Sequence, residues 1–311
     1  MNARFDQGAL DARKAIYRLD ATCEHRRVAV GGRVVCWRRL GAGPPLVLLH
    51  GGHGSWLHWV RNLEALAAHY TVWVPDMPGF GDSDDLDVSP RSPERLKVLC
   101  DTLLRSLNQL LGAQAEIDLV AFSFGCVVAA ELCRRRGSIR RMALLGAAGH
   151  GGPRRTDLDL GNWRSIEGDQ RAEALKHNLI TLMLHQSSSA DALALAAYQS
   201  CCESTRFHSK PFSRSPVMTR ALNDLTIPIL FVWGEYDITG SPNLLAERLT
   251  SNRPEREWVV MPSAGHWVQY ERSHDIDLLL LRWLKRSVGE DRSSSKSTRE
   301  GKSWSPHVMR R

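Results

Sequence analysis

The chain has 311 residues, 43% of them hydrophobic, which is enough to bury the core of one large domain or two small ones. No apolar run reaches the roughly 18 residues that a membrane span needs, and the polar N-terminus has no apolar signal segment, so we expect a soluble cytoplasmic protein. The net charge of +7 lies mostly near the C-terminus, where residues 285–311 carry eight Lys or Arg against three acidic residues, and it therefore does not favour a nucleic-acid partner.

Strands and helices alternate along most of the chain. Residues 28–41 predict two short strands around a Gly-Gly turn. Further strands, several of them continuous apolar runs typical of strands buried on both faces, are predicted at 44–52, 71–76, 116–122, 139–149, 227–234 and 255–262. Helices are predicted at 55–69, 92–112, 126–137, 243–250 and 274–286. The second of these helices should begin with Ser92 as N-cap and Pro93 as its first helical residue.

The alternation stops at 150–215, a polar stretch that favours helix and contains no convincing strand. Alternating strands and helices predict an α/β fold with a mostly parallel central sheet and helices on both faces. The interrupting block then forms an inserted helical cap above the carboxyl ends of the strands, where ligands bind in such sheets. We therefore expect an N-terminal extension (1–27), a core of 28–149 and 216–286, the cap, and a basic disordered tail (287–311).

Ser123 lies where a buried strand runs directly into a helix of small residues. A serine on such a tight turn has its hydroxyl lifted clear of the sheet, and the N–H of Phe124 points into the same space. The positive end of the helix dipole adds to this N–H in stabilising a developing oxyanion. The spacing resembles G-x-S-x-G, with the small residue Ala121 in place of the first glycine and Gly125 kept as the second.

A base and an acid follow Ser123 in the chain, each in a loop after a predicted strand. His266 lies in a loop of small residues, and Asp237 follows the strand at 227–234, with Glu235 as the alternative acid. A serine hydroxyl is a poor nucleophile until a base takes its proton, and the base needs a carboxylate to fix its tautomer. The order Ser, Asp, His therefore predicts a catalytic triad.

Two glycine-containing loops complete the predicted site. Gly52, after the strand at 44–52, is the candidate for the second oxyanion donor beside Phe124. His50 next to it is expected to hydrogen-bond the loop rather than act as a base. In the loop after residue 76, Asp82 and Ser83 are expected to tie the chain down by local hydrogen bonds.

These pieces occur in the order typical of the α/β-hydrolase superfamily, which the chain resembles over about residues 30–286. They read LVLLHGG, DMPGFGDSD, LVAFSFGC, LFVWGEYD and SAGHWVQYE. The resemblance implies hydrolysis of an ester or related acyl group of a small molecule, with no cofactor and no metal. A serine at position 123 argues against the dehalogenase and epoxide hydrolase branches, which carry aspartate there. The stretch GHWVQYE resembles both small-ester hydrolases and hydrolases that cleave carbon–carbon bonds in ring-fission products.

The substrate pocket and the reaction remain open at this point. The candidate pocket residues are His53, Trp56, Trp163 and Trp267. A carbon–carbon bond hydrolase of a diketone-type acid would need a cap cation for the substrate carboxylate, for which Arg164, Arg171 and Lys176 are candidates. A non-hydrolytic protein of the same fold is the third alternative. No metal-ligand spacing and no phosphate-binding loop is present.

Overall fold

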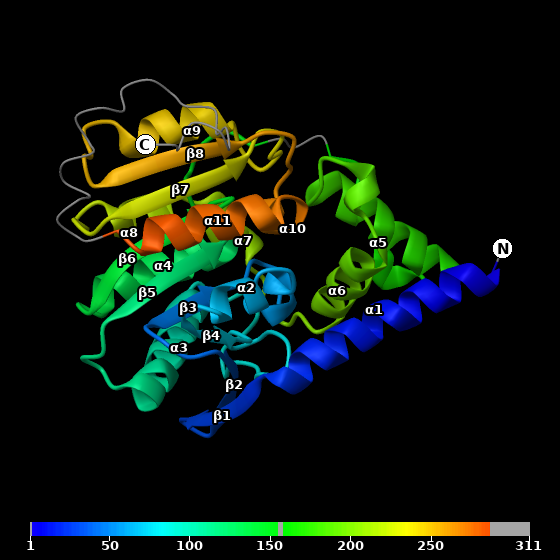
Figure 1. Cartoon of the computed structure of the whole chain (residues 1–311), viewed down its shortest axis with the longest axis horizontal. Coiled ribbons are helices and arrows are strands. Elements are labelled where there is room, and N and C mark those ends of the chain that lie inside the picture. Colours follow the sequence, from blue (N-terminus) through cyan, green and yellow to red (C-terminus); the bar gives the residue numbers. More distant parts are fainter. Residues whose placement is uncertain (1, 155–157, 287–311) are drawn as a thin grey trace.

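The computed structural model describes residues 2–154 and 158–286, and its eight strands form one sheet in the order β1-β2-β4-β3-β5-β6-β7-β8 (Figure 1). The strands are β1 (Glu24–Val30), β2 (Arg33–Leu40), β3 (Pro45–Leu49), β4 (Thr71–Pro75), β5 (Ile117–Phe122), β6 (Ile139–Leu145), β7 (Ile229–Gly234) and β8 (Arg256–Met261). Strand β2 pairs antiparallel with β1 and β4, and every other pairing is parallel. The expected mostly parallel sheet is confirmed.

The sheet separates two hydrophobic cores, because successive side chains of a strand point to opposite faces. In β3, Val47 and Leu49 belong to one core, while Leu46 and Leu48 belong to the other. The first core is closed by α3 (Arg95–Leu111), α4 (Phe124–Arg135), α8 (Val217–Leu222) and α9 (Pro242–Thr250). The second is closed by α2 (Leu63–Ala67), α10 (Val268–Glu271) and α11 (Ser273–Leu284).

The described part of the predicted cap is helical. Residues 150–215 contain η2 (Trp163–Ser165), α5 (Gly168–Leu182), η3 (Ser187–Ser189), α6 (Ala192–Glu203) and α7 (Lys210–Arg214). The described residues of this block, 150–154 and 158–215, contain no strand. Helices α5 and α6 stand beside the sheet in Figure 1 and add their apolar residues to the second core. Helix α7 instead packs against α4 of the first core.

The N-terminal extension is largely one long helix, α1 (Asn2–Thr22), where no element was expected. Its core-facing residues Ala12, Ile16 and Leu19 follow the i, i+4, i+7 spacing of a helix, so this element does have a periodic apolar face. Helix α1 packs against α6, and Figure 1 shows it running along the cap away from the sheet.

The proposed disordered tail at 287–311 lies outside the described residues. No helix in the described part of the chain is both long and apolar enough to cross a membrane.

Several predicted boundaries are wrong, each for a local reason. The helix expected at 55–69 is two short pieces, η1 (Trp56–Trp59) and α2. Helix α3 begins at Arg95 rather than at Pro93, because Ser92 accepts the N–H of Glu94 through its hydroxyl and that of Arg95 through its carbonyl, which forms a turn instead. Strand β6 ends at Leu145 because Gly146 adopts φ +51°.

Candidate active site

Ser123 occupies a strained turn between β5 and α4. Its backbone has φ 52° and ψ −117°, a left-handed conformation that costs a non-glycine residue about 1–3 kcal/mol. A hydrogen bond to the neighbouring strand holds the turn, since Ser123 N–H donates to Leu145 O of β6 at 2.8 Å. Gly125 is required here, because a Cβ at this position would lie 2.5 Å from the carbonyl oxygen of His50. The turn places Ser123, a half-buried residue, at the carboxyl end of β5.

Two residues of this turn, Ala121 and Cys126, stand where the family's elbow usually carries glycine, and both are buried. Ala121 is fully buried at the end of β5. The Cys126 thiol, in the first turn of α4, donates to the carbonyl oxygen of Ala121 at 3.4 Å. Complete burial raises the pKa of Cys126 far above the ordinary value of a thiol. Cys126 is therefore a neutral packing residue behind the nucleophile.

The structure brings Ser123, His266 and Asp237 together. Ser123 Oγ lies 2.9 Å from His266 Nε2, and His266 Nδ1 lies 2.9 Å from Asp237 Oδ2. His266 follows β8 and Asp237 follows β7, so neighbouring parallel strands deliver them to the same edge as β5 delivers the serine. The alternative acid, Glu235, is exposed and accepts the N–H of Ser263 instead.

Thr239 holds the second carboxylate oxygen of Asp237. The Thr239 hydroxyl donates to Asp237 Oδ1 at 2.7 Å, and the Thr239 N–H donates to the same atom at 2.9 Å. Burial works to raise the pKa of Asp237, but His266 and the two Thr239 donors outweigh it, so the pKa lies below its ordinary value. The carboxylate stays ionised beside the imidazole. Sequence reasoning missed Thr239, because nothing in its spacing shows which atom its hydroxyl reaches.

The Gly51–Gly52 segment lies against the nucleophile. A Cβ at Gly51 would stand 3.1 Å from Ser123 Cβ, and one at Gly52 would stand 3.6 Å from Phe124 Cβ. The N–H of Gly52 donates to no acceptor among the described residues. Phe124 is the first residue of α4, so its N–H has no partner within the helix. Among the described residues, the N–H groups of Gly52 and Phe124 therefore have no backbone acceptor, and both belong to segments that lie against the nucleophile.

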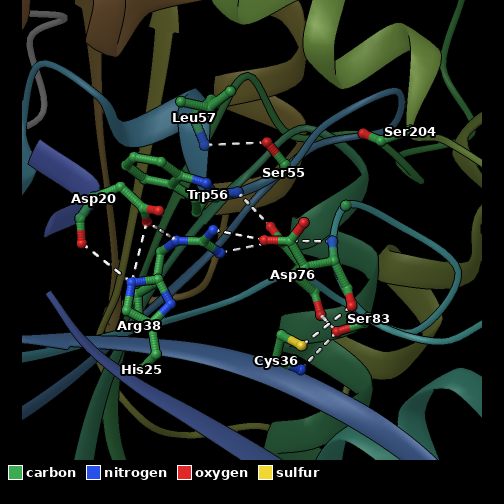
Figure 2. Close-up of polar contacts among 12 residues, drawn as sticks. Asp20, His25, Cys36, Arg38, Ser55, Trp56, Leu57, Asp76, Ser83 and Ser204 are labelled. Atoms are coloured by element: carbon green, nitrogen blue, oxygen red, sulfur yellow. Dashed lines mark hydrogen bonds and ion pairs between the residues drawn. The ribbon is translucent and has the colours of Figure 1, made fainter. Parts of the chain in front are cut away.

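A buried ion pair between Arg38 and Asp76 anchors the loop that follows β3 (Figure 2). Arg38 of β2 pairs with Asp76, with Nη1 3.1 Å from Oδ2, and Asp76 Oδ1 accepts the N–H of Trp56 at 2.9 Å. Arg38 also pairs with Asp20 of α1 and with Asp82. Burial lowers the pKa of Arg38, but the three carboxylates raise it more, so the guanidinium is always charged. The network fixes the loop after β3 to the loop after β4 and to α1.

The four expected pocket residues lie in different surroundings. Trp267 is fully buried and donates its indole N–H to His58 O at 3.0 Å, so it offers no accessible surface to a substrate. Trp56 is 5% exposed and lies under the Arg38 guanidinium. Trp163 is buried in the cap, whereas the side chain of His53 is exposed next to Gly52.

Of the three candidate cations of the cap, Arg164 lies close enough to His53 to influence the pKa of its ring. Protein atoms crowd the His53 ring although solvent reaches part of it. This burial, together with the nearby Arg164 and His208, lowers the pKa of His53. Arg171 instead pairs with Glu203 at 3.1 Å, and Lys176 borders a groove between α1 and the cap. Among the described residues, no group of three or more His, Cys, Asp and Glu side chains is arranged to hold a metal ion.

Comparisons with known proteins place the chain in a family. A family model described as "Alpha/beta hydrolase family" matches residues 46–276. The dihydrolipoyllysine-residue acetyltransferase component of the acetoin cleaving system of Pseudomonas putida is 28% identical over 84% of this chain and 69% of its own. The 2-hydroxy-6-oxo-6-phenylhexa-2,4-dienoate hydrolase of Burkholderia cepacia is 26% identical over 78% of this chain and 88% of its own.

The solved structures agree with this assignment at the level of the fold. Naproxen esterase (carboxylesterase NP) of Bacillus subtilis matches with a TM-score of 0.68 at 16% identity, covering 92% of this chain and 100% of that one. The family model covers most of the chain and both strands that precede the candidate acid and base. The chain therefore belongs to the alpha/beta hydrolase family.

Proposed function

We propose that the protein is a serine hydrolase that cleaves an ester or related acyl bond of a small molecule through an acyl-enzyme. The observation that carries the proposal is the continuous array from Asp237 through His266 to Ser123, with both contacts at 2.9 Å. Such an array turns a serine hydroxyl into a nucleophile, because the imidazole accepts its proton and the carboxylate stabilises the resulting charge.

The mechanism uses each group once in each half of the reaction. His266 Nε2 removes the proton of Ser123 as Oγ attacks the acyl carbon, and the N–H groups of Phe124 and Gly52 receive the oxyanion. His266 then protonates the leaving alkoxide, which departs and leaves the acyl group on Ser123. Water, deprotonated by His266, attacks the same carbon, and the bond to Ser123 Oγ breaks as His266 returns the proton to this oxygen, which releases the acid.

Ser123→Ala removes the nucleophile without changing the buried surroundings of the turn. We expect hydrolysis of p-nitrophenyl esters of rising acyl length, and labelling by a fluorophosphonate probe, to fall to background in this variant. Ser251→Ala, which makes the same change at an exposed position after α9, should retain both. A Ser123→Ala protein that hydrolyses esters at the original rate would refute the proposal.

Carbon–carbon bond hydrolysis of a diketone-type acid is the second candidate. It is favoured by Arg164, a cation of the cap segment that lies close enough to His53 to lower the pKa of His53. Such a group could hold the carboxylate of the substrate. His266 would first assist proton transfer within the substrate, which converts its enol form into the ketone that Ser123 attacks. The relative from Burkholderia cepacia carries the name of such a hydrolase.

One substrate panel separates the two candidates. The purified protein is given p-nitrophenyl esters and, in parallel, a vinylogous diketone acid whose absorbance falls on cleavage. Turnover of the esters alone supports the first candidate, whereas much higher kcat/KM on the acid supports the second. In both cases Ser123→Ala serves as the blank.

A further inference from the structure

Two buried histidines bond the two backbone polar groups of Gly51. His50 Nδ1 donates to Gly51 O at 2.8 Å, and Gly51 N–H donates to Nδ1 of His58 at 3.0 Å. The tautomers follow from these partners. His50 accepts the N–H of Met77 at Nε2, so its proton is on Nδ1. The neutral His58 ring accepts at Nδ1, so its proton is on Nε2.

These two bonds fix the peptide planes on both sides of Gly51. Its N–H belongs to the plane shared with His50, and its carbonyl belongs to the plane that carries the Gly52 N–H. The N–H and C=O of a trans peptide point in opposite directions, so the bond to Gly51 O constrains the direction of the Gly52 N–H as long as Gly51 itself is held. A glycine rotates freely about both of its backbone bonds, so one hydrogen bond alone does not fix the segment.

We propose that His58 is a positioning residue for the oxyanion site, and this inference rests on the proposed function. By accepting the Gly51 N–H, His58 keeps that donor away from the reacting oxygen and holds the chain so that the Gly52 N–H faces it. A side chain at position 51 would restrict the chain only by displacing its neighbours, because its Cβ would lie 3.1 Å from both the Phe122 ring and Ser123 Cβ.

Packing alone does not account for a histidine at position 58. The ring is 1% exposed and lies edge-on to Phe122 and Trp267, with centroids 5.1 and 5.3 Å away. Its Nε2 has no hydrogen-bond partner among the described residues. An apolar ring would fill the same space without an unpaired buried donor, which destabilises a fold. What only the histidine supplies here is the acceptor at Nδ1.

His58 also remains an acceptor under the conditions in which hydrolases are assayed. Burial lowers the pKa of His58 well below its ordinary value, and the neighbouring His50, His266 and His53 add to this. The imidazolium form could not accept the Gly51 N–H, so a lowered pKa keeps the bond intact at neutral pH.

Two substitutions separate the acceptor from the ring. His58→Phe keeps the aromatic volume and loses the acceptor, whereas His58→Asn keeps an acceptor near the position of Nδ1 and loses the ring. We expect His58→Phe to lower kcat for p-nitrophenyl butyrate by about 100-fold with little change in KM, as for loss of one oxyanion donor. His58→Asn should keep most of the kcat. Wild-type kcat in His58→Phe, or equal losses in both variants, would overturn the inference.

Hydrogen–deuterium exchange of the peptide covering 50–54 tests the same bond without catalysis. Exchange should be faster than wild type in folded His58→Phe and close to wild type in His58→Asn, with thermal melting as the check on folding. If His58→Phe does not fold, His58→Leu removes the same acceptor. Equal exchange in all variants overturns the role of His58. A wild-type protein that neither hydrolyses esters nor binds fluorophosphonate at Ser123 instead contradicts the proposed function, and the exchange data still decide whether His58 holds the loop.

Discussion

The hydrogen bonds from Thr239 help to keep Asp237 ionised, and the ionised carboxylate is the form that orients His266. Replacing Thr239 by the isosteric Val removes the hydroxyl donor at 2.7 Å and leaves the backbone donor at 2.9 Å. The loss of a hydrogen bond to a charged group should lower kcat/KM about 10-fold or more, and Thr239→Ser, which keeps the hydroxyl, should remain near wild type. Equal activity in Thr239→Val and wild type would show that the hydroxyl is dispensable.

Thr239→Val should also change how the stability of the folded protein depends on pH. A carboxyl group whose folded pKa is lowered stabilises the protein above its unfolded pKa, and this stability is lost as the pH falls through the folded value. Without the Thr239 hydroxyl, the folded pKa of Asp237 rises toward its ordinary value. Urea unfolding across the acidic range should therefore show stability lost at higher pH in Thr239→Val than in Thr239→Ser.

The sequence was sufficient to predict that Ser123, Asp237 and His266 meet, because each follows a strand of a parallel sheet and such strand ends lie at one edge. It was insufficient for Thr239 and His58. Their roles depend on which backbone or carboxylate atom a side chain reaches, and residue type and spacing do not determine that. Their assignment required the distances in the folded chain.

At the scale of secondary-structure elements, α2 and α11 meet at a buried pair of polar side chains. Asn62, the N-cap residue of α2, donates Nδ2 to Asp277 Oδ1 at 2.8 Å, while its own Oδ1 has no partner among the described residues. Burial raises the pKa of Asp277 to about 7, an effect that the bond from Asn62 partly offsets. The folded protein therefore binds this proton more tightly than the unfolded chain does, and its stability falls as the pH rises from about 4 to 7.

Asp277→Asn should remove this pH dependence. An amide cannot ionise, and its NH₂ can donate to the unpaired Oδ1 of Asn62. We expect a gain of about 1–2 kcal/mol in unfolding free energy at pH 8 and little gain at pH 5, measured by urea unfolding. Asp275→Asn on the same helix breaks the ion pair with Arg272 and should show no such gain. A gain in Asp277→Asn that is larger at pH 5 than at pH 8 would contradict the assignment.

Element boundaries were the part of the fold that the sequence predicted least well. Periodicity indicates where an apolar face lies, but in α1 the residues of that face, Ala12, Ile16 and Leu19, alternate with exposed apolar residues such as Leu10 and Tyr17, which obscure it. What holds α1 in place is contact with distant parts of the chain: Asp20 pairs with Arg38 of β2, and the helix packs on α6. Contacts of this kind arise only in the folded chain and leave no local pattern.

At the scale of the whole molecule, alternation predicted a parallel sheet but not its strand order. Strand β4 lies between β2 and β3, and that order depends on the way each crossover packs its helix against the sheet. The position of the cap is likewise set by long-range contacts. Asp191 of the cap pairs with Arg61 and accepts the hydroxyl of Tyr270 at 2.6 Å. These contacts fix the cap segment to the loop after β3 and to α10.

Glu271, at the end of α10, joins the cap to the loop that carries His266. Its carboxylate accepts the N–H groups of Gly265 at 2.6 Å, of His185 at 3.0 Å and of Gln186 at 2.9 Å. Three backbone donors on two segments therefore converge on one charged group. Glutamine has the same size but only one acceptor oxygen, and its NH₂ would face at least one of these donors.

Glu271→Gln should therefore loosen the cap and the base loop together. We expect a loss of about 2 kcal/mol in unfolding free energy, since hydrogen bonds to a charged group are involved, and faster hydrogen exchange at both 183–186 and 264–267. Glu203→Gln, which breaks only the partly exposed pair with Arg171, should lose less than about 1 kcal/mol. If exchange increases in the cap segment while the base loop stays protected, Glu271 serves the cap alone, and the coupling between cap position and His266 is wrong.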